Sequence, residues 1–437
     1  MAMKKKHKTI KLALLGCGTV GTGVLKVLKE NYHDIKEKIG ADIEVSKVLV
    51  RNLNKKREVP GNPVFTDDPK EIFKDPEIDI VVELLGGIHP AREYMIEAME
   101  HGKHVVTANK DVVAQFGKDV FDAAEQNDVD FMFEASVGGG IPIITPLKQS
   151  LTANKITELI GIVNGTTNYM LTKMTEEGMD YETALAQAQE KGYAEADPTA
   201  DVGGLDAARK AAILSSIAFN TRIGLDDVAV EGITKITPED IQYADELGYI
   251  IKLLAIARNS KHGIDVRVHP TFISKDHPLA SVRNEFNAIF IHGNAVGDTM
   301  FYGKGAGEKP TASAVLADII DVARDMGKDR FGRIRCTCYE KKKLCPPDKV
   351  LSGYYIRLLV DDKPGVLGAI ATAFGESGIS LHSVIQTRRV EDHSEIVAIT
   401  HNVNDSQLDD LKHRLGKLKV VNAISNVIRV VVSEGDA

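Results

Sequence analysis

A glycine-rich turn between a strand and a helix constrains this fold more than any other feature of the sequence. Residues 8–31 read KTIKLALLGCGTVGTGVLKVLKEN, a short apolar run followed by GCGTVG and then an amphipathic helical pattern. Gly16, Gly18 and Gly21 fit the dinucleotide-binding fingerprint, in which one glycine makes the tight turn, one admits the pyrophosphate and one lets helix and strand pack closely. A simple tight turn is the alternative, but the position directly after a strand and at the start of a helix favours a dinucleotide site.

The rest of the first 145 residues alternates strands with helices. ADIEVSKVLVRN, DIVVELLGG, KHVVTANK and VDFMFEASVGGGIPII predict further strands, and PAREYMIEAMEHG predicts a helix. Such alternation is typical of right-handed βαβ units on a parallel sheet. We therefore predict an α/β protein in which residues 8–145 form a Rossmann-type domain with a parallel sheet.

Later segments predict further units. From residue 146 the pattern changes to long helices, so 146–309 is interpreted as a second, α+β domain. The amphipathic helix at 310–328 is expected to pack back on the first domain. Residues 331–350 mix charge, cysteine and a proline pair and are interpreted as a linker. Residues 351–437 follow the order strand, helix, strand, strand, helix, strand, which predicts a ferredoxin-like βαββαβ module that binds a ligand or pairs with its twin through sheet edges.

Composition disfavours two classes of partner. The 437 residues carry 54 basic and 62 acidic side chains, a formal net charge of −8, and no long basic face, so no nucleic-acid partner is expected. No apolar run reaches the roughly 18 residues that a membrane span requires, and the basic start MAMKKKHKTI lacks the apolar stretch of a signal peptide. The protein is therefore interpreted as cytoplasmic, with no membrane partner and with a small solute as its ligand.

The four cysteines are too few and too clustered for a secreted disulfide framework. Three of them, Cys336, Cys338 and Cys345, lie within CTCYEKKKLC, where a closed zinc site would need a fourth ligand and no histidine is nearby. A linker whose thiols stay reduced is the favoured interpretation. The role of the three thiols stays open.

The end of the second predicted strand indicates which dinucleotide binds. NAD sites usually place an acidic residue there for the ribose hydroxyls, but this strand ends in VLVRNLNKKR. Arg51, with Lys55, Lys56 and Arg57 behind it, suits a 2′-phosphate, because a guanidinium offers paired donors to phosphate oxygens. We predict a preference for NADP, with NAD possible as a second cofactor. A solvated basic loop is the alternative.

The fourth predicted strand ends in VTANK. This places Thr107, Asn109 and Lys110 at the carboxyl edge of the sheet, where open α/β sheets bind their ligands. Lys110 is therefore positioned to reach a reacting group. An exposed lysine at a strand end is an equally good interpretation of the segment by itself.

A run of acidic residues precedes a lysine in GYAEADPTADVGGLDAARKAAIL, residues 192–214. Asp206 and Lys210 are four residues apart and share one face of the predicted helix, behind Glu195 and Asp201. The segment by itself favours a capped helix with a surface ion pair. A pocket for a small cationic substrate is the other interpretation, and the dinucleotide domain upstream supports it, because that domain needs a partner that holds the substrate.

The ordered motifs GCGTVGTGV, LLGG, VTANK, EASVGGGIPII, GIVNGTTNY, GYAEADPTADVGGLDAARK and YGKGAGEKPTASAV together resemble homoserine dehydrogenase over residues 8 to about 330. The segment DDKPGVLGAIATAFGESGISL resembles an ACT domain, as in the single-function form of the family. The resemblance implies that residues 146–309 form the substrate-binding, catalytic and dimerisation domain and that 351–437 form an ACT regulatory domain.

The resemblance also implies an activity. Members interconvert L-homoserine and L-aspartate 4-semialdehyde with NAD(P), in threonine, methionine and isoleucine biosynthesis. Feedback by threonine at the ACT domain and a homo-oligomer, dimer or tetramer, are expected from the same resemblance. A pure assembly role of the ACT-like unit is the alternative, because domain presence does not establish coupling.

Site roles follow from the resemblance as well. Lys210 is implied to exchange the alcohol proton, Asp206 to orient it, and Lys110 to reach substrate and nicotinamide. The implied substrate-binding residues are Glu195, for the amino group, Asp201, Tyr193 and Thr166. The implied cofactor contacts are Gly16, Cys17, Gly18, Thr19, Val20, Gly21, Arg51, Gly86, Thr107, Lys110, Gly192 and Gly305. A structural sodium ion is implied on the main-chain oxygens of Glu134, Val137, Gly139 and Ile141.

A catalytically silent amino-acid sensor with the same domains is the alternative function. Such a sensor has no need to keep Lys110, Glu195, Asp206 and Lys210 together. Their joint presence favours an enzyme.

Overall fold

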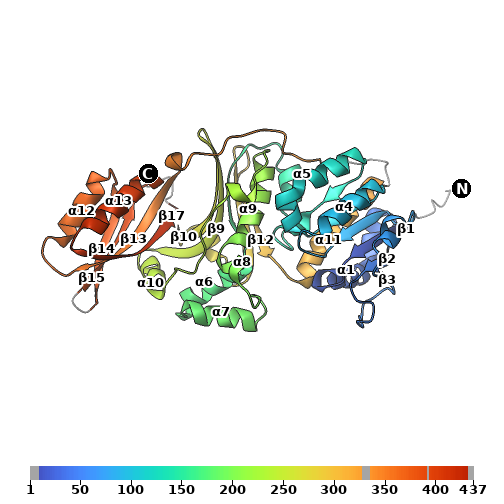
Figure 1. The fold of residues 1–437 in the computed structure, drawn as a ribbon, viewed down its shortest axis with the longest axis horizontal. Coiled ribbons are helices and arrows are strands. Elements are labelled where there is room, and N and C mark those ends of the chain that lie inside the picture. Colours follow the sequence, from blue (N-terminus) through green and yellow to red (C-terminus); the bar gives the residue numbers. More distant parts are fainter. Residues whose placement is uncertain (1–8, 327–334, 391–392, 432–437) are drawn as a thin grey trace. The chain divides into compact units, whose positions relative to one another are not determined.

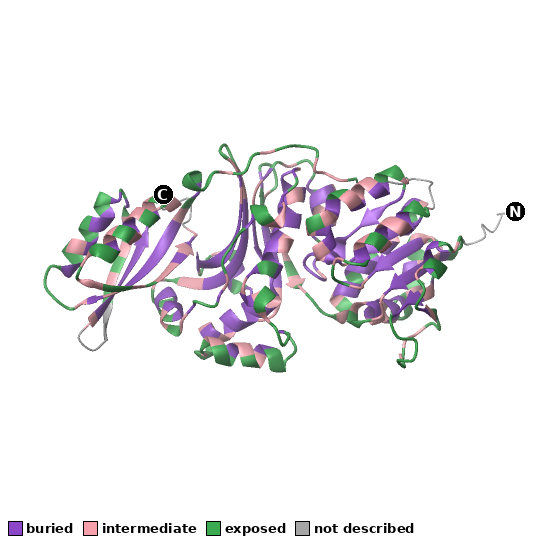
Figure 2. Cartoon of the chain, viewed as in Figure 1, coloured by how far each residue is buried: buried purple, intermediate pink, exposed green. Residues whose placement is uncertain are grey.

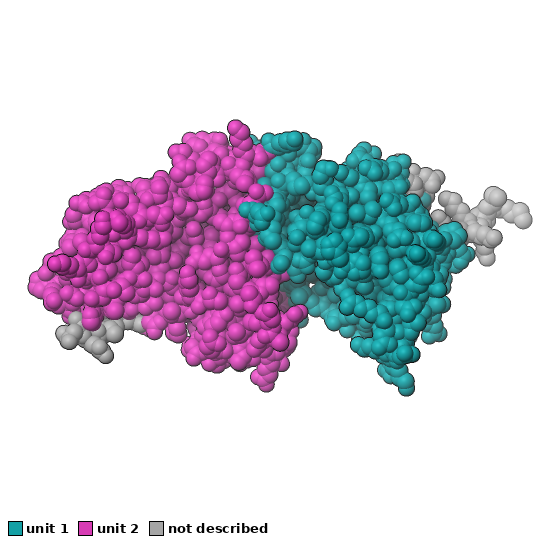
Figure 3. All heavy atoms as spheres, in the orientation of Figure 1, with its two compact units in different colours: residues 1–156, 209–226, 287–341 teal, residues 157–208, 227–286, 342–437 magenta. Residues whose placement is uncertain are grey.

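The computed structural model describes residues 9–326, 335–390 and 393–431 (Figure 1). The chain divides into two compact units, which Figure 3 shows in two colours. The first unit comprises Met1–Ile156, Arg209–Asp226 and Asn287–Lys341. The second comprises Thr157–Ala208, Asp227–Phe286 and Lys342–Ala437.

A parallel sheet forms the centre of the first unit. Its strands are β1 (Thr9–Leu15), β2 (Asp42–Leu49), β3 (Val64–Thr66), β4 (Ile80–Glu83), β5 (His104–Thr107) and β6 (Phe131–Met132). They lie in the order β3-β2-β1-β4-β5-β6, and every neighbouring pair is parallel. This is the doubly wound strand order of a dinucleotide-binding fold, so the predicted Rossmann-type sheet is confirmed. Figure 2 shows the central strands β1, β4 and β5 as mostly buried, because helices cover both faces of a parallel sheet.

Helices cover the sheet of the first unit. They are α1 (Thr19–Glu30), α2 (Tyr32–Ile39), α3 (Lys70–Phe73), α4 (Ala91–Glu100), α5 (Lys110–Gln126) and α11 (Glu308–Met326). Although α11 comes late in the chain, its residues Val315 and Ile319 share one buried core with Leu12 of β1 and Val24 of α1. A Cβ atom on Gly23 would lie only 2.6 Å from the main-chain oxygen of Glu308, so this glycine allows α1 and α11 to approach closely.

Two short turns and a pair of strands complete the first unit. They are a 3₁₀ turn at Glu134–Ser136, a π turn at Pro146–Ser150, and the strands β11 (Phe286–Gly293) and β12 (Gly297–Lys304). The helix α9 (Leu205–Ala218) contributes its part from Arg209 onward to this unit.

The first half of the second unit contains both helices and strands. The elements are β7 (Ile156–Ile162), α6 (Gly165–Glu177), α7 (Tyr181–Glu190), α8 (Thr199–Val202), β8 (Ala229–Val230), α10 (Pro238–Glu246), β9 (Tyr249–Ser260) and β10 (Gly263–Ser274). β9 and β10 form an antiparallel hairpin, and β7 pairs antiparallel with β9. Short 3₁₀ turns lie at Leu225–Asp227 and Pro278–Ser281.

The C-terminal part of the second unit is a βαββαβ module, as predicted. After a 3₁₀ turn at Pro347–Lys349, its elements are β13 (Leu351–Asp361), α12 (Val366–Glu376), β14 (Leu381–Val390), β15 (His393–Thr400), β16 (Val403–Asn404), α13 (Asp405–Lys417) and β17 (Val421–Val430). The long strands lie in the order β17-β13-β15-β14 and pair antiparallel. β17 also pairs in parallel with β10, where Thr271 faces Arg429, so the module continues the preceding sheet.

A buried ionic network joins the module to α10. Arg357 Nε on β13 lies 3.0 Å from Asp240 Oδ1 on α10, and Arg357 Nη1 lies 2.9 Å from Glu395 Oε1 on β15. The Tyr355 hydroxyl donates a further hydrogen bond to Asp240. All three charged side chains are buried, so each needs its partners to offset the loss of hydration.

Among the described residues, no helix is both long enough and apolar enough to cross a bilayer.

Candidate functional site

The glycine-rich turn of the first unit has the geometry that the fingerprint predicts. Gly16 adopts φ +110°, and a Cβ atom on it would lie 2.9 Å from the main-chain oxygen of Leu84. A Cβ atom on Gly21 would lie 2.5 Å from the Gly16 oxygen, which explains the close packing of α1 on its own turn. A Cβ atom on Gly18 would meet nothing within 4 Å, so the N-terminus of α1 is open to a ligand.

The other turn residues, Cys17, Thr19 and Val20, lie between these glycines. Gly18 is the N-cap of α1, and Thr19 and Val20 are its first residues. Their main-chain amides therefore belong to the first turn of the helix, where N–H groups have no partner within the helix and a bound anion is favoured. Cys17 is partly buried and packs against the core of this unit. The structure thus assembles every residue of the predicted phosphate-binding turn in one place.

A buried carboxyl group, which sequence reasoning missed, lies at the end of β4. Glu83 is fully buried and accepts a 2.6 Å hydrogen bond from the Thr107 hydroxyl and a 2.7 Å hydrogen bond from the Leu85 amide. Burial raises the pKa of Glu83, while these hydrogen bonds act in the opposite direction. The Glu83 carboxyl group thus links the ends of β4 and β5 at the carboxyl edge of the sheet. The signal in the sequence was an acidic residue inside the apolar run VVELL.

The segment VTANK forms the start of α5 at this edge. The Thr107 hydroxyl accepts a hydrogen bond from the Asn109 amide, and Asn109 caps α5 through a 3.2 Å bond from the Val112 amide. The Asn109 side chain also donates to the main-chain oxygen of Gly87, in the turn that follows β4. Lys110 is the first residue of α5 and is partly buried. This network holds the helix start that carries Lys110 against the β4 turn.

The two predicted lysines lie on helices that contact each other within the first unit. Arg209 Nε on α9 forms a 2.8 Å ion pair with Asp111 Oδ1 in the first turn of α5. Arg209 precedes Lys210, and Asp111 follows Lys110. The ion pair therefore joins the two helices at the residues that adjoin the two lysines.

The remaining predicted cofactor residues of the first unit lie on loops. Arg51 follows β2 and is exposed, as are Lys55 and Lys56 behind it. Gly86, at φ +72°, lies exposed in the turn after β4. Gly305 follows β12, and a Cβ atom on it would lie 2.0 Å from Nδ2 of Asn287, so a larger residue there would require the Asn287 side chain to move.

The loop that contains Glu134, Val137, Gly139 and Ile141 has a shape that fits a small cation. Gly138 and Gly139 both adopt positive φ, and a Cβ atom on Gly138 would lie 3.4 Å from the Ile141 oxygen, which shows how tightly the loop curls. Within the described residues, no hydrogen-bond donor reaches the main-chain oxygens of Val137, Gly139 or Ile141, and the Glu134 oxygen accepts only a long 3.4 Å bond. Main-chain oxygens that lack donors are good ligands for a hard cation.

The Glu134 side chain anchors this loop. Its carboxylate accepts hydrogen bonds from the amides of Ile143, Ile144 and Thr145, and its own amide donates to Asp318 on α11. Burial, together with the nearby charge of Glu134, raises the pKa of Asp318 well above its ordinary value. The carboxylate of Glu134 thus binds main-chain amides of the loop, while its main-chain oxygen belongs to the predicted cation site.

Two of the acids from the stretch 192–214 meet in the second unit. Nδ2 of Asn164 donates to Asp201 Oδ1 at 2.7 Å and to Asp206 Oδ2 at 2.9 Å. The amide nitrogen has two hydrogens, so one side chain serves both carboxylates. Oδ1 of Asn164 caps α6 by accepting from the Thr167 amide. Asn164 is therefore a third member of the acidic site, and it lies in the motif GIVNGTTNY.

Other predicted substrate residues surround this acidic pair. The Thr166 hydroxyl donates to the main-chain oxygen of Tyr193 at 2.6 Å and lies 3.4 Å from Asp201 Oδ2. The Tyr193 ring is partly exposed and packs against the Tyr169 ring, with 4.9 Å between the centroids.

Glu195 and Gly192 lie on the exposed loop before α8. The main-chain oxygen of Glu195 accepts a hydrogen bond from the Gln189 side chain, and its own side chain is exposed. Asp201, Asp206 and Thr166 are thus brought together, whereas Glu195 is presented from a neighbouring loop.

Asp206 and Lys210 lie on one continuous helix. α9 begins at Leu205, so Asp206 is in its first turn and Lys210 follows one turn later. Residues four apart on a helix share a face, which confirms the local geometry that the spacing predicted. Asp206 is buried and Lys210 is half-buried. The helix thus carries an acid held by Asn164 and a lysine on the same side.

Comparisons with known proteins agree with these features. A model of the homoserine dehydrogenase NAD-binding domain matches residues 16–134, a homoserine dehydrogenase model matches residues 142–320, and an ACT domain model matches residues 354–420. The homoserine dehydrogenase of Synechocystis is 45% identical over 97% of this chain and all of that protein. The Bacillus subtilis enzyme is 41% identical over 97% of this chain and 98% of its own length.

Solved structures give the same result. A homoserine dehydrogenase from Thiobacillus denitrificans superposes with a TM-score of 0.92 at 43% identity, covering 97% of this chain and 99% of that one. A hyperthermophilic archaeal homoserine dehydrogenase in complex with NADPH has a TM-score of 0.62 at 27% identity, covering 72% and 98%. With a doubly wound sheet, an open glycine turn and an acid–lysine helix, this chain belongs to the homoserine dehydrogenase family, whose members are nicotinamide-dependent oxidoreductases.

Proposed function

We propose that this protein catalyses the reversible NAD(P)-dependent interconversion of L-homoserine and L-aspartate 4-semialdehyde, in threonine, methionine and isoleucine biosynthesis. The observation that carries the proposal is the acidic pair held by Asn164, with one of its members one helical turn before Lys210. Both substrates carry an ammonium, a carboxylate and a terminal alcohol or aldehyde. A pair of carboxylates suits the ammonium, and a lysine suits the terminal oxygen.

The roles of the side chains follow from this chemistry. Asp201, Asp206 and Glu195 attract the substrate ammonium, and Thr166 and Tyr193 shape the pocket. When homoserine is oxidised, Lys210 takes the hydroxyl proton, and in the reverse direction it returns this proton to the aldehyde oxygen. Lys110, at the start of α5, supplies a second positive charge beside the carboxyl ends of β4 and β5. A bound nicotinamide supplies the hydride acceptor at its C4 carbon.

A spectrophotometric assay tests the proposal directly. Homoserine with an oxidised nicotinamide dinucleotide should produce the absorbance of the reduced cofactor, and the reverse reaction should consume it. No turnover in either direction would favour a silent amino-acid sensor.

The preferred cofactor is NADP. Arg51 and the exposed lysines that follow it offer cationic donors to a 2′-phosphate, and the archaeal relative at 27% identity was solved with NADPH. The ratio of kcat/KM for NADP to that for NAD should exceed one in the wild type and fall in Arg51→Asp. An unchanged ratio in the variant would remove Arg51 from cofactor selection.

A sodium ion on the main-chain oxygens of Glu134, Val137, Gly139 and Ile141 is part of the proposal. Its role is to hold the loop in its curled shape, because oxygens without donors repel one another unless a cation neutralises them. The midpoint of thermal unfolding should be higher in sodium chloride than in choline chloride of equal ionic strength. Equal midpoints would argue against the ion.

Threonine binding at the ACT module and a homodimeric or tetrameric assembly complete the proposal. β14 is the last strand in its sheet order, so its outer edge is available to pair with a second copy. Millimolar threonine should lower the steady-state rate, and light scattering should give at least twice the monomer mass. A rate that does not respond to threonine would leave the ACT module with an assembly role.

A further inference from the structure

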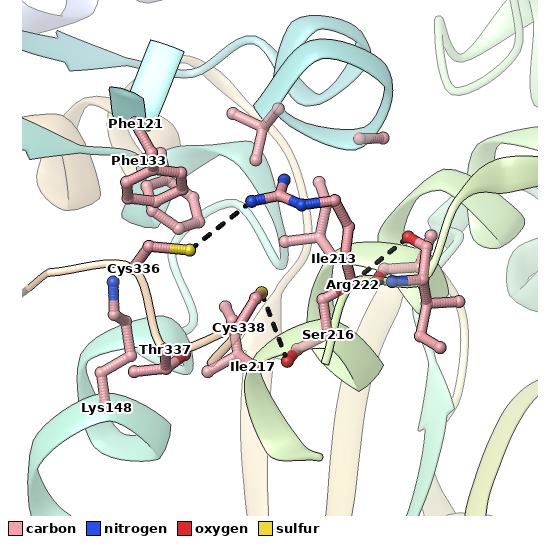
Figure 4. Close-up of a pocket in the computed structure, with 14 residues that line it drawn as sticks. Phe121, Phe133, Lys148, Ile213, Ser216, Ile217, Arg222, Cys336, Thr337 and Cys338 are labelled. Atoms are coloured by element: carbon pink, nitrogen blue, oxygen red, sulfur yellow. Dashed lines mark hydrogen bonds between the residues drawn. The ribbon is translucent and has the colours of Figure 1, made fainter. Parts of the chain in front are cut away.

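A small cavity in the first unit brings together two thiols and two cationic side chains (Figure 4). Its volume of about 30 Å³ gives room for a molecule of the size of water or hydrogen peroxide. Its walls come from α5, from the part of α9 after Arg209, from the π turn and from residues 336–338. None of the residues to which the dehydrogenase reaction is assigned lines it.

The backbone makes a tight turn at the segment that carries the two thiols, residues 336–339. The Tyr339 amide donates a 3.0 Å hydrogen bond to the main-chain oxygen of Thr337, so the backbone turns at Cys338. Cys336 and Cys338 are both free and partly buried, which leaves them within reach of a small reagent. Figure 4 shows the Cys336 sulfur directed toward Arg222 and the Cys338 sulfur directed toward Ser216.

Each of the two sulfurs has a polar neighbour. Nη2 of Arg222 lies 3.6 Å from Cys336 Sγ, and the Cys338 thiol lies 3.8 Å from the main-chain oxygen of Ser216. The buried ammonium of Lys148 lies 5.2 Å and 5.3 Å from the ring centroids of Phe121 and Phe133. In Figure 4 it is directed toward Cys336.

These neighbours make the two thiols unequal. Interaction with the neighbouring Cys338 thiol lowers the pKa of Cys336 well below its usual range, and the charges of Arg222 and Lys148 act in the same direction. The same interaction between the two thiols, together with burial, raises the pKa of Cys338. Burial lowers the pKa of Lys148 to about 8, so near neutral pH this side chain still carries a positive charge in most molecules. Both shifts favour ionisation of Cys336 before Cys338.

A metal ion is a poor occupant of this cavity. The positive charges of Arg222 and Lys148 disfavour a cation. In the ranges that the structure covers, no group of three or more histidine, cysteine, aspartate or glutamate side chains has the arrangement of a metal site. The cavity instead favours chemistry in which a thiolate reacts and a negative leaving group is stabilised.

We propose that Cys336 and Cys338 form a peroxide-sensitive dithiol, in which a hydroperoxide oxidises Cys336 and Cys338 then closes a disulfide. The Cys336 thiolate attacks the terminal oxygen of the hydroperoxide. The new S–O bond forms as the O–O bond breaks, and the departing alkoxide or hydroxide takes a proton from Lys148 or solvent. The Cys338 sulfur then attacks the sulfenic acid. The S–S bond forms, the S–O bond breaks, and the hydroxyl leaves as water with the proton of the Cys338 thiol. The two thiols together lose two electrons, and the hydroperoxide gains them.

Peptide mass spectrometry of the full chain tests the proposal without reference to dehydrogenase activity. Trypsin cuts after Arg335 and Lys341 and releases CTCYEK, which contains both thiols and no other cysteine. After brief exposure to hydrogen peroxide and blocking of the remaining thiols, this peptide should be lighter than its reduced form by two hydrogens. Cys345, whose pKa burial raises, provides an internal comparison in the same chain. CTCYEK should oxidise at least ~10-fold faster than the Cys345 peptide, because only a thiolate is the nucleophile.

Two variants separate the roles of the thiols. Cys338→Ser should stop at a Cys336 sulfenic acid that dimedone traps, whereas Cys336→Ser should lose the rapid reaction although one cysteine remains. Arg222→Met should slow the reaction of Cys336 with hydrogen peroxide. Cys345→Ser should leave the rate of this Cys336 reaction unchanged. Equal rates for CTCYEK and the Cys345 peptide in the wild type would overturn the proposal, as would independent oxidation of both thiols without a disulfide.

Discussion

Nδ2 of Asn164 lies 2.9 Å from Oδ2 of Asp206, so the cap of one helix is also the donor to an acid at the start of another. The same nitrogen serves Asp201, and Oδ1 of Asn164 remains the N-cap of α6. An amide is suited to both tasks because it has one accepting and one donating end. Aspartate, by contrast, only accepts when it is ionised.

The substitution Asn164→Asp therefore separates the two roles of this side chain, the helix cap and the shared hydrogen-bond donor. It keeps a good helix cap but replaces the shared donor with a third negative charge beside two others. The free energy of unfolding should fall by ~1–3 kcal/mol, and KM for homoserine should rise. Urea unfolding and steady-state kinetics measure the two effects. Asn404 also caps a helix with its side-chain oxygen, so Asn404→Asp is the matched control and should change KM little. Equal effects of the two variants on KM would show that Asn164 acts only as a cap.

Lys210→Ala should remove turnover while the protein still binds its cofactor. A positioned proton acceptor contributes roughly 10²–10⁴-fold to such a reaction, so kcat should fall by at least the lower of these factors. Fluorescence titration with NADPH measures cofactor binding separately. Lys118→Ala, at an exposed position of α5, is the control and should retain wild-type kcat. A Lys210→Ala enzyme with normal kcat would refute the assignment of the acid/base.

Lys252 on β9 predicts a pH dependence of stability. Its ammonium is fully buried and donates to the Val282 oxygen at 2.6 Å and to Asn168 Oδ1 at 3.1 Å, and burial lowers its pKa to about 8. The unfolded chain keeps the ordinary value of 10.5. Between about pH 8 and pH 10.5, the unfolded state binds more protons at Lys252 than the folded state does. The free energy of unfolding therefore rises as the pH rises through this window. It falls again as the pH falls toward and through the folded pKa.

The test compares wild type with Lys252→Met in urea at about pH 7 and about pH 10. The variant lacks the charge penalty, so its stability relative to wild type should be greatest at the lower pH and decline toward the higher one, by up to ~3 kcal/mol. Lys275→Met, which changes an exposed lysine, is the control and should show no such trend. A constant difference between Lys252→Met and wild type would mean that Lys252 keeps its ordinary pKa in the fold.

Arg357 lies buried between two carboxylates, and its removal should be costly. Arg357→Met leaves Asp240 and Glu395 in the core without their cation, so the free energy of unfolding should fall by ~3–5 kcal/mol. Adding Asp240→Asn and Glu395→Gln to the variant should recover part of this loss, because neither amide carries a charge. Thermal and urea unfolding measure both changes.

Arg414 provides the control for Arg357. It also contacts two carboxylates, Asp410 at 2.8 Å and Glu376 at 2.6 Å, but at a more exposed position on α13. Solvent screens such pairs, so Arg414→Met should have a much smaller effect. If the two arginine variants were equally destabilised, burial would not be the source of the effect at Arg357.

Local features of the fold were accessible from the sequence because each depends on neighbouring residues. The turn at Gly16, Gly18 and Gly21, the strands that flank it and the βαββαβ order of the C-terminal module follow from short-range spacing and periodicity. The same holds for Asp206 and Lys210, since four residues of helix place them on one face. In each case the backbone conformation of a single segment decides the geometry.

Contacts between distant segments were decided only by the tertiary structure. Glu83 meets Thr107 across 24 positions, Asn164 meets Asp206 across 42, and Arg222 meets Cys336 across 114. No periodicity links such residues, because their contact depends on how strands and helices pack rather than on the spacing within one element. Burial decides the chemistry in the same way: Lys252 is an ordinary lysine in the sequence, and it becomes a weakly basic one only because the core surrounds it. The sequence alone thus determined the family pattern and the local geometry of α9, and the packing of the chain determined the donor of the acidic site and the environment of the two thiols.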